Sequence, residues 1–296
     1  MKKIILGLFV AFGISSCSLN TDNSEYQSCG DYSNVTFSGF PLECNYTIKE
    51  MPAKPMAVAI KTQEKMDSFF IKNTNPCPTP ITPVNPNIDF TKNYLIGIFS
   101  GPKPTGGYEI KISSIVENSC EIIVQYYEKE PLPNEAGNTP ATNPYDFVLI
   151  PKTDKPIYLN KVSQNKNFVI IGSYSGLCTG PDCQLFFNIN NLNVLQYLNV
   201  VDGQYDFSKY NYQTLNKKGD YSDFVKLVPT EILNLDGGTK IYGSPDSADQ
   251  GGIFFELNQG NKVTKVFIDN NNTPDQSPEI ITFKKAIKDK IAVLRN

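Results

Sequence analysis

Residues 94–99 read Tyr-Leu-Ile-Gly-Ile-Phe, a continuous apolar run. Residues 108–112 read Tyr-Glu-Ile-Lys-Ile, in which apolar and polar side chains strictly alternate. A period of two is typical of a half-buried β-strand. Two more strand-like runs follow at residues 121–127 and 145–150. Four strands in succession predict a mainly antiparallel β module.

The sequence before residue 94 extends this module and adds one helix. Residues 56–60 read as a strand, and residues 62–72 as a short helix that begins at the capping residue Thr62. Residues 73–87 contain five prolines and are predicted to be a loop, because proline removes backbone donors and breaks regular structure. We expect the first module to occupy residues 37–165.

The second half of the chain predicts a separate module at residues 166–296, in which helices pack on a sheet. The final helix is predicted over residues 278–294, because apolar residues recur there at helical spacing. The predicted fold class is therefore α+β and β-rich, with two modules. The other predicted strands are 168–171, 184–189, 253–257 and 263–268, and the other helical segments are 221–228 and 230–235.

Composition excludes several classes of function. The chain has 296 residues with no histidine, 27 basic and 30 acidic side chains, and a net charge of −3. Without an imidazole there is no Ser-His-Asp or Cys-His catalysis and no His-ligated zinc. No basic tract is present to attract a phosphate backbone. We therefore expect a non-enzymatic protein with no cofactor and no nucleic-acid partner, the alternative being an enzyme that uses only carboxylates, as glycosidases do.

Two groups of acidic residues are candidate calcium ligands. Residues 269–275 resemble a calcium loop, but Thr-Pro occupies the place of the required glycine, and Ile280 falls at the last ligand position. Asp246 and Asp249, with Asp269 and Glu256, supply further oxygen ligands, although turn formation explains them more simply. No metal site is predicted.

The first seventeen residues indicate export and lipid attachment. Lys2 and Lys3 precede an apolar run of eleven residues, which is too short to span a bilayer and is typical of a signal peptide. The run ends Ile-Ser-Ser-Cys17, which resembles a bacterial lipobox. We expect a signal peptide at residues 1–16, a lipid such as palmitate on Cys17, and a polar tether at residues 17–36. The residue after Cys17 is not aspartate, which favours the outer membrane over the inner one.

The six remaining cysteines predict disulfides, because an exported chain matures in an oxidising compartment. Cys178 and Cys183 flank Gly180-Pro181, whose turn brings the two Cα atoms within disulfide reach. Pairing of neighbours then suggests Cys29 with Cys44 and Cys77 with Cys120.

Part of the first module resembles a known family, the C-terminal domain of PrcB, described as a protease-complex subunit. The resemblance covers roughly residues 56–160. It implies an exported, often lipid-anchored module with no known catalytic residues, associated in at least one case with the assembly of a cell-envelope protease. It is carried by Gly-Pro-Lys-Pro-Thr-Gly-Gly-Tyr-Glu-Ile at residues 101–110, Asp89-Phe90, Glu130-Pro-Leu-Pro, and residues 143–152.

The glycine-rich part of this pattern is the candidate binding loop. Its residues are Lys103, Thr105, Gly106, Gly107 and Tyr108. A hairpin turn between two strands and a contact loop for a partner both fit the pattern, because glycine provides backbone freedom without any acid, base or nucleophile.

Two hypotheses of function follow. In the first, an envelope lipoprotein anchored in the bilayer through Cys17 docks its β module onto another exported protein, with a protease as one candidate. In the second, the chain binds a small molecule, glycan or peptide on a platform of exposed tyrosines such as Tyr205, Tyr210 and Tyr212.

Overall fold

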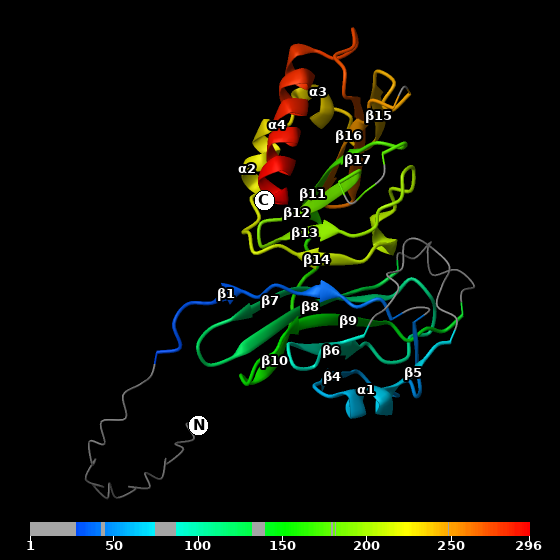
Figure 1. Ribbon diagram of the computed structural model, residues 1–296, viewed down its shortest axis with the longest axis vertical. Helices are drawn as coiled ribbons and strands as arrows, with labels where there is room; N and C mark the ends of the chain where they lie inside the picture. Colours follow the sequence, from blue (N-terminus) through cyan, green and yellow to red (C-terminus); the bar gives the residue numbers. More distant parts are fainter. Residues whose placement is uncertain are drawn as a thin grey trace, which may run out of the picture.

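The computed structural model describes residues 28–42, 45–74, 87–131, 140–178, 180, 182–247 and 249–296. The signal peptide, Cys17, Cys44 and Cys77 lie outside these residues. The fold is β-rich with a few helices, as predicted. Figure 1 shows two lobes stacked along the long axis, an N-terminal lobe of residues up to 161 and a C-terminal lobe from residue 167. Among the described residues no helix is long and apolar enough to cross a membrane.

The N-terminal lobe is built from two facing sheets. One has the order β1-β7-β8-β10, and the other is the β2-β9-β6-β4 part of a larger sheet. Alternate side chains of β6, β7, β8 and β9 meet between them in a buried aliphatic core. The four predicted strands are therefore confirmed. The bounds are β1 Ser33–Asn34, β2 Ser38–Gly39, β4 Met56–Ile60, β6 Asn93–Phe99, β7 Glu109–Glu117, β8 Ile122–Lys129, β9 Tyr145–Pro151 and β10 Ile157–Lys161.

A third layer covers the outer face of β6 and β9. It consists of α1 (Gln63–Phe69) and the pair of strands β3 (Tyr46–Ile48) and β5 (Phe70–Lys72). The predicted cap is confirmed, because the backbone N–H of Lys65 donates to the Thr62 hydroxyl at 3.2 Å. The predicted helix ends too late, at residue 72. Phe70 leaves the helix because its ring packs on Phe147 in the aromatic core of this layer.

The C-terminal lobe has a seven-stranded sheet in the order β15-β17-β16-β11-β12-β13-β14. Helices cover one face of it (Figure 1). The strands are β11 Asn167–Tyr174, β12 Gln184–Ile189, β13 Val194–Tyr197, β14 Tyr212–Thr214, β15 Gly238–Tyr242, β16 Gly252–Gln259 and β17 Lys262–Asp269. The helices are η1 Phe207–Lys209, α2 Tyr221–Phe224, η2 Val225–Leu227, α3 Thr230–Leu233 and α4 Pro278–Arg295.

The predicted C-terminal helix is confirmed as α4. Ser277 caps it by accepting a hydrogen bond from the Ile280 backbone N–H at 3.2 Å, and Pro278 occupies its first turn. The five apolar residues at helical spacing are all buried. Among them, Phe283 meets the ring of Phe255 on β16 edge to face, with the ring centres 4.9 Å apart. The helix is thereby fixed on the sheet.

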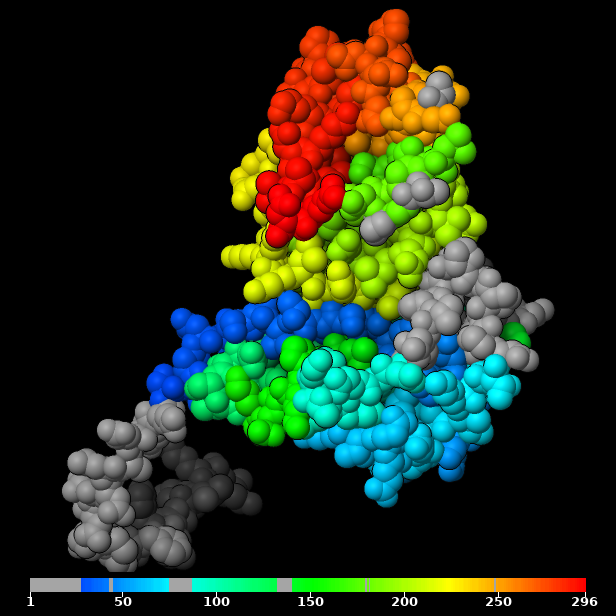
Figure 2. Space-filling model, in the orientation of Figure 1, coloured from blue at the N-terminus to red at the C-terminus, as the bar shows by residue number. Residues whose placement is uncertain are grey.

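Residues 37–39 join the two lobes into one eleven-stranded sheet. β2 pairs with β9 on one side, and on the other with β14 through Ser38 and Gln213. The Thr214 backbone N–H donates to the Phe37 carbonyl at 2.7 Å. In Figure 2 the blue N-terminal segment runs along the boundary between the lobes. We call this β2–β14 pairing the seam.

Two strand glycines lie opposite phenylalanines. Gly97 pairs with Phe147, and Gly172 with Phe186. A Cβ built on either glycine would lie 2.2 Å from the ring of its partner. Each ring therefore lies across the backbone of the neighbouring strand, and glycine is required there by close approach.

The disulfides confirm one predicted pair and correct the others. Cys178 and Cys183 are bonded, with Cα atoms 5.4 Å apart. Cys29, however, is bonded to Cys120, so its predicted pairing with Cys44 and that of Cys77 with Cys120 are both wrong. Cys44 and Cys77 themselves lie outside the described residues.

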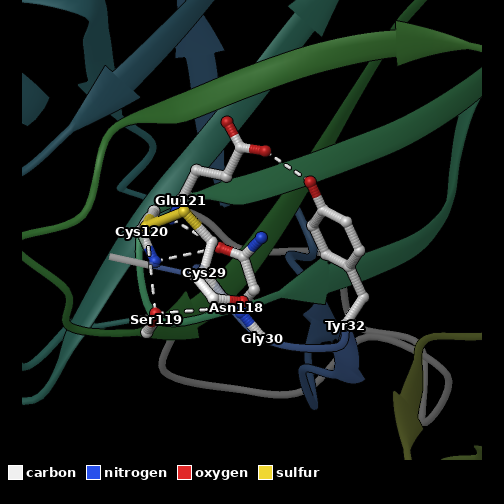
Figure 3. Close-up of a disulfide and its surroundings, with 8 residues drawn as sticks. Cys29, Gly30, Tyr32, Asn118, Ser119, Cys120 and Glu121 are labelled. Atoms are coloured by element: carbon white, nitrogen blue, oxygen red, sulfur yellow. Dashed lines mark hydrogen bonds between the residues drawn. A yellow bond between two sulfur atoms is a disulfide. The ribbon is translucent and has the colours of Figure 1, made fainter. Parts of the chain in front are cut away.

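Strand order explains the unexpected bond. β1 pairs antiparallel with β7, which brings the residues before β1 beside the β7–β8 turn that carries Cys120. Figure 3 shows the bond and its neighbours, among them Ser119, whose backbone N–H donates to the Cys29 carbonyl at 3.0 Å. Tyr32 also donates a hydrogen bond to Glu121. Residues 28–36 of the predicted tether therefore belong to the folded N-terminal lobe.

Candidate functional site: the cleft between the lobes

A cleft of about 480 Å³ lies between the two lobes. The N-terminal lobe supplies residues of β7 and β8, and the C-terminal lobe supplies residues of β13 and β14 and of the segment around η1. A second hollow of about 360 Å³ shares Lys111, Tyr210 and Tyr212 with it. The volume of the larger cleft is within the range of ordinary small-ligand sites.

Aromatic rings form the wall of the cleft on the side of the C-terminal lobe. Phe207 stacks on Tyr197 with ring centres 4.8 Å apart and also contacts Tyr205 and Phe186. Asp206 caps η1 by accepting from the Ser208 backbone N–H, which fixes the turn that carries Phe207. The wall is therefore a packed surface, since each ring is held by others.

Three tyrosine hydroxyl groups come together in the cleft. Tyr127 belongs to β8, Tyr197 to β13 and Tyr212 to β14. Burial raises the pKa of all three, and nearby carboxylates raise it further: Glu109 and Asp146 act on Tyr127, Glu256 on Tyr197, and Asp146 on Tyr212. The hydroxyls are therefore neutral at physiological pH and able both to donate and to accept hydrogen bonds.

The two lysines at the cleft are held by buried carboxylates. Lys111 Nζ lies 3.1 Å from Asp146, which also accepts from the Ile112 backbone N–H at 2.8 Å. Burial raises the pKa of Asp146, and Lys111 opposes that shift. Lys265 Nζ lies 3.4 Å from Glu256. Each lysine charge is thus neutralised at its own position in the sheet.

Glu109 is different, because no described residue forms an ion pair with its carboxylate. It begins β7, is half-buried, and lines the cleft. It raises the pKa of the Tyr127 hydroxyl through its negative charge. The cleft is therefore lined by a carboxylate, that of Glu109, which forms no ion pair with another described residue.

The predicted binding loop lies beside the cleft, since Tyr108 directly precedes Glu109. It is not a hairpin turn, because β6 and β7 belong to different sheets and the loop crosses from one to the other. The hairpin interpretation is therefore wrong. Lys103 Nζ lies 5.4 Å from the centre of the Tyr108 ring, and Lys103 exchanges two backbone hydrogen bonds with Thr142.

Thr142 also supports the middle of this loop. Its hydroxyl donates to the Thr105 carbonyl at 3.0 Å. Gly107 has a φ of +82°, and a Cβ there would lie 2.8 Å from Pro131. Gly106 lies in the same bend and is half-buried. The loop residues predicted from the sequence therefore lie together, on a backbone that Thr142 holds in place.

The predicted tyrosine platform is only partly as expected. Tyr205, Tyr210 and Tyr212 do line the cleft, but none of them is exposed as predicted. Tyr205 and Tyr212 are half-buried, and Tyr210 is buried, with its hydroxyl donating to the Gln204 carbonyl at 2.7 Å. Sequence reasoning missed Glu109 and Tyr127, because nothing in an alternating strand shows which polar position faces another lobe.

The segment that resembles a calcium loop surrounds a lysine. Lys284 on α4 is 4% exposed, and its Nζ donates to five oxygens at 2.7–3.2 Å. Burial and the nearby charge of Lys288 lower the pKa of this ammonium, while the negative charge of Asp269 opposes the shift. The five acceptors are the carbonyls of Asp269, Asn270 and Asn271 and the side-chain oxygens of Asn272 and Gln276.

Comparison with known proteins finds a family model that is similar to one part of the chain. Residues 94–151 match the family model described as PrcB C-terminal, which confirms the resemblance over β6 to β9. No curated protein matches the chain, and no solved structure matches it. The matched residues include the binding loop and the cleft residues of the N-terminal lobe.

Proposed function

We propose that this protein is a non-enzymatic lipoprotein of the cell envelope, anchored through Cys17, that docks onto another exported protein, with a subunit of a protease complex as the partner class. The match of residues 94–151 to the PrcB C-terminal family carries the proposal. The lipobox-like sequence before Cys17 and the Cys29–Cys120 disulfide support an exported location.

The docking surface in this proposal is the loop at residues 101–108. A braced loop loses little conformational freedom when it binds, which favours recognition. Its exposed residues include Pro102, Pro104 and Gly107, and Lys103 adds a positive charge beside the ring of Tyr108.

The test is affinity purification of the lipidated protein from envelope extracts, followed by identification of the co-purifying chains. An exported protease, or a known subunit of one, should be enriched over a control bait. The double variant Lys103→Glu with Thr105→Ala should lower its recovery without changing the melting temperature. Recovery of no exported protein above the control would refute the docking function, and unchanged recovery with the double variant would refute the loop as its surface.

The cleft supports a second function, the binding of a small ligand. Its volume of about 480 Å³, packed aromatic wall and convergent hydroxyls are the features expected of such a site. This function is compatible with docking, because the cleft opens next to the loop rather than at it.

A further inference from the structure

The charges around the cleft are arranged asymmetrically. Lys111 and Lys265 point their ammonium groups at Asp146 and Glu256, whereas Glu109 has no ion-pair partner among the described residues. The side chains of Asp146 and Glu256 are each 9% exposed, and those of Lys111 and Lys265 are 38% and 36% exposed, so each pair joins a buried carboxylate to a lysine at the cleft. Lys129 lies opposite Glu109 on β8, but no ion pair joins the two. A ligand that enters therefore meets a carboxylate that has no direct ion-pair partner among the described residues.

The Glu109 carboxylate also acts on a tyrosine of the cleft. Burial is the main cause of the raised pKa of Tyr127, and the negative charge of Glu109 raises it further. Aromatic faces add to this effect, because the face of a π system is negative and attracts cations. Phe207 and Tyr197 both line the cleft, with their ring centres 4.8 Å apart.

We infer that the cleft binds an organic cation, an alkylammonium or guanidinium group, which pairs with Glu109 and lies against the aromatic wall. This inference rests on the second function proposed above, that the cleft binds a ligand. An anionic ligand would be repelled by Glu109, and both lysines that line the cleft are already paired with carboxylates.

The size of the cleft indicates that the cation is part of a larger ligand. A volume of about 480 Å³ is several times what one ammonium group fills. Two sources share this chemistry: a free polyamine, and a lysine or arginine side chain on an exported polypeptide. Measurement with both kinds of probe distinguishes them.

The experiment is isothermal titration calorimetry on the mature protein from residue 17, with Cys17 replaced by serine so that it remains in solution. The probes are spermidine, the peptide Ala-Lys-Ala with blocked ends, its norleucine counterpart, and the neutral trisaccharide N,N′,N″-triacetylchitotriose (chitotriose below). We expect the cationic probes to bind and the norleucine peptide not to bind. Stronger binding of spermidine indicates a free amine, and stronger binding of the lysine peptide indicates a polypeptide.

Variants then test the residues. Glu109→Gln keeps the shape but removes the charge, and should weaken cation binding by roughly tenfold or more, since a hydrogen bond to a charged group contributes more than a neutral one. Tyr212→Leu removes a ring from the cleft and should weaken cation binding by about threefold. The matched control is Glu64→Gln in the first turn of α1, which should leave binding unchanged. Circular dichroism checks that each variant is folded.

The outcomes separate the two levels of the proposal. If chitotriose or the norleucine peptide binds as tightly as the cationic probes, the cleft is a ligand site but the cation assignment is wrong. If Glu109→Gln has no more effect than Glu64→Gln, the pairing with Glu109 is wrong. If no probe binds, the cation inference fails together with the ligand-binding function for these classes, while the docking function stands or falls on its own test.

Discussion

Replacement of Lys284 by methionine should destabilise the C-terminal lobe strongly. Methionine fills similar space but removes the ammonium that donates to all five oxygens. The carbonyls of Asp269 and Asn271 still accept from Gln276 Nε2, so the loss falls mainly on the other three. Three of the five oxygens are backbone carbonyls in the connection between β17 and α4. Removing one side of a buried charged site costs roughly 3–5 kcal/mol, because the groups left behind are desolvated and unpaired. We expect the free energy of unfolding to fall by about that amount.

The matched control is the neighbouring residue, Lys285→Met. Lys285 is exposed and pairs with Asp289 one turn along α4, an arrangement that contributes about 0.3–0.5 kcal/mol. The two variants change the same helix by the same chemical step and differ in burial. The comparison therefore separates the loss of the hydrogen bonds of Lys284 from any effect on helix propensity.

The assay is urea unfolding followed by near-ultraviolet circular dichroism. The two lobes have separate hydrophobic cores, so each lobe can give its own unfolding transition. The loss should appear in the transition that α4 belongs to. Added calcium should not stabilise the wild type, because an ammonium group already occupies the loop. If Lys284→Met is no less stable than Lys285→Met, the hydrogen bonds of Lys284 do not hold the connection between β17 and α4 in place, and the reasoning is wrong.

Three further predictions follow from the sequence and fold. Cys17→Ala should move the protein from the membrane to the soluble fraction; a variant that stays on the membrane after a carbonate wash would contradict lipid anchoring. Non-reducing peptide mapping should recover Cys29 bonded to Cys120, and loss of this bond, which joins residues 91 apart, should cost about 4–5 kcal/mol in the chain-entropy account. Folding raises the pKa of Tyr127 and Tyr197, so both stay protonated above pH 10, where tyrosines of the unfolded chain ionise. The free energy of unfolding should therefore fall as the pH rises past 10. Absorbance at 295 nm follows the ionisation, and ionisation of all tyrosines near pH 10 without unfolding would contradict this prediction.

Local patterns in the sequence predicted the longer strands and α4, but not the strands β1, β2, β3, β5, β10, β13, β14 and β15. The alternation at residues 108–112 predicted β7, and the spacing of apolar residues after Pro278 predicted α4, because each pattern is set by which face of its own element is buried. Where a distant contact competes, the local pattern fails. Phe70 continues the helical pattern of α1 but instead pairs in a strand and packs on Phe147.

Long-range pairing explains the predictions that were wrong. The assignment of Cys29 to Cys44 assumed that neighbours in sequence are neighbours in space. The chain instead adds its first strand to the edge of β7, about ninety residues later, and this carries Cys29 to Cys120. Strand order in a sandwich is set by the packing of whole sheets, so the spacing of cysteines does not encode it.

The cleft depends on the seam in the same way. Glu109 and Tyr127 belong to the β7–β8 pair, whereas Tyr197 and Tyr212 belong to β13 and β14 of the other lobe. These residues face one another because the short strand β2 pairs with both lobes, and because side chains such as Asn193, which donates to the Ser113 carbonyl at 3.1 Å, also cross the boundary. A ligand that contacts both walls would favour the arrangement in which the seam is formed, since binding stabilises the state that binds. Binding in the cleft and the relative position of the lobes are therefore thermodynamically linked, and substitutions at the seam should change ligand affinity without touching the ligand.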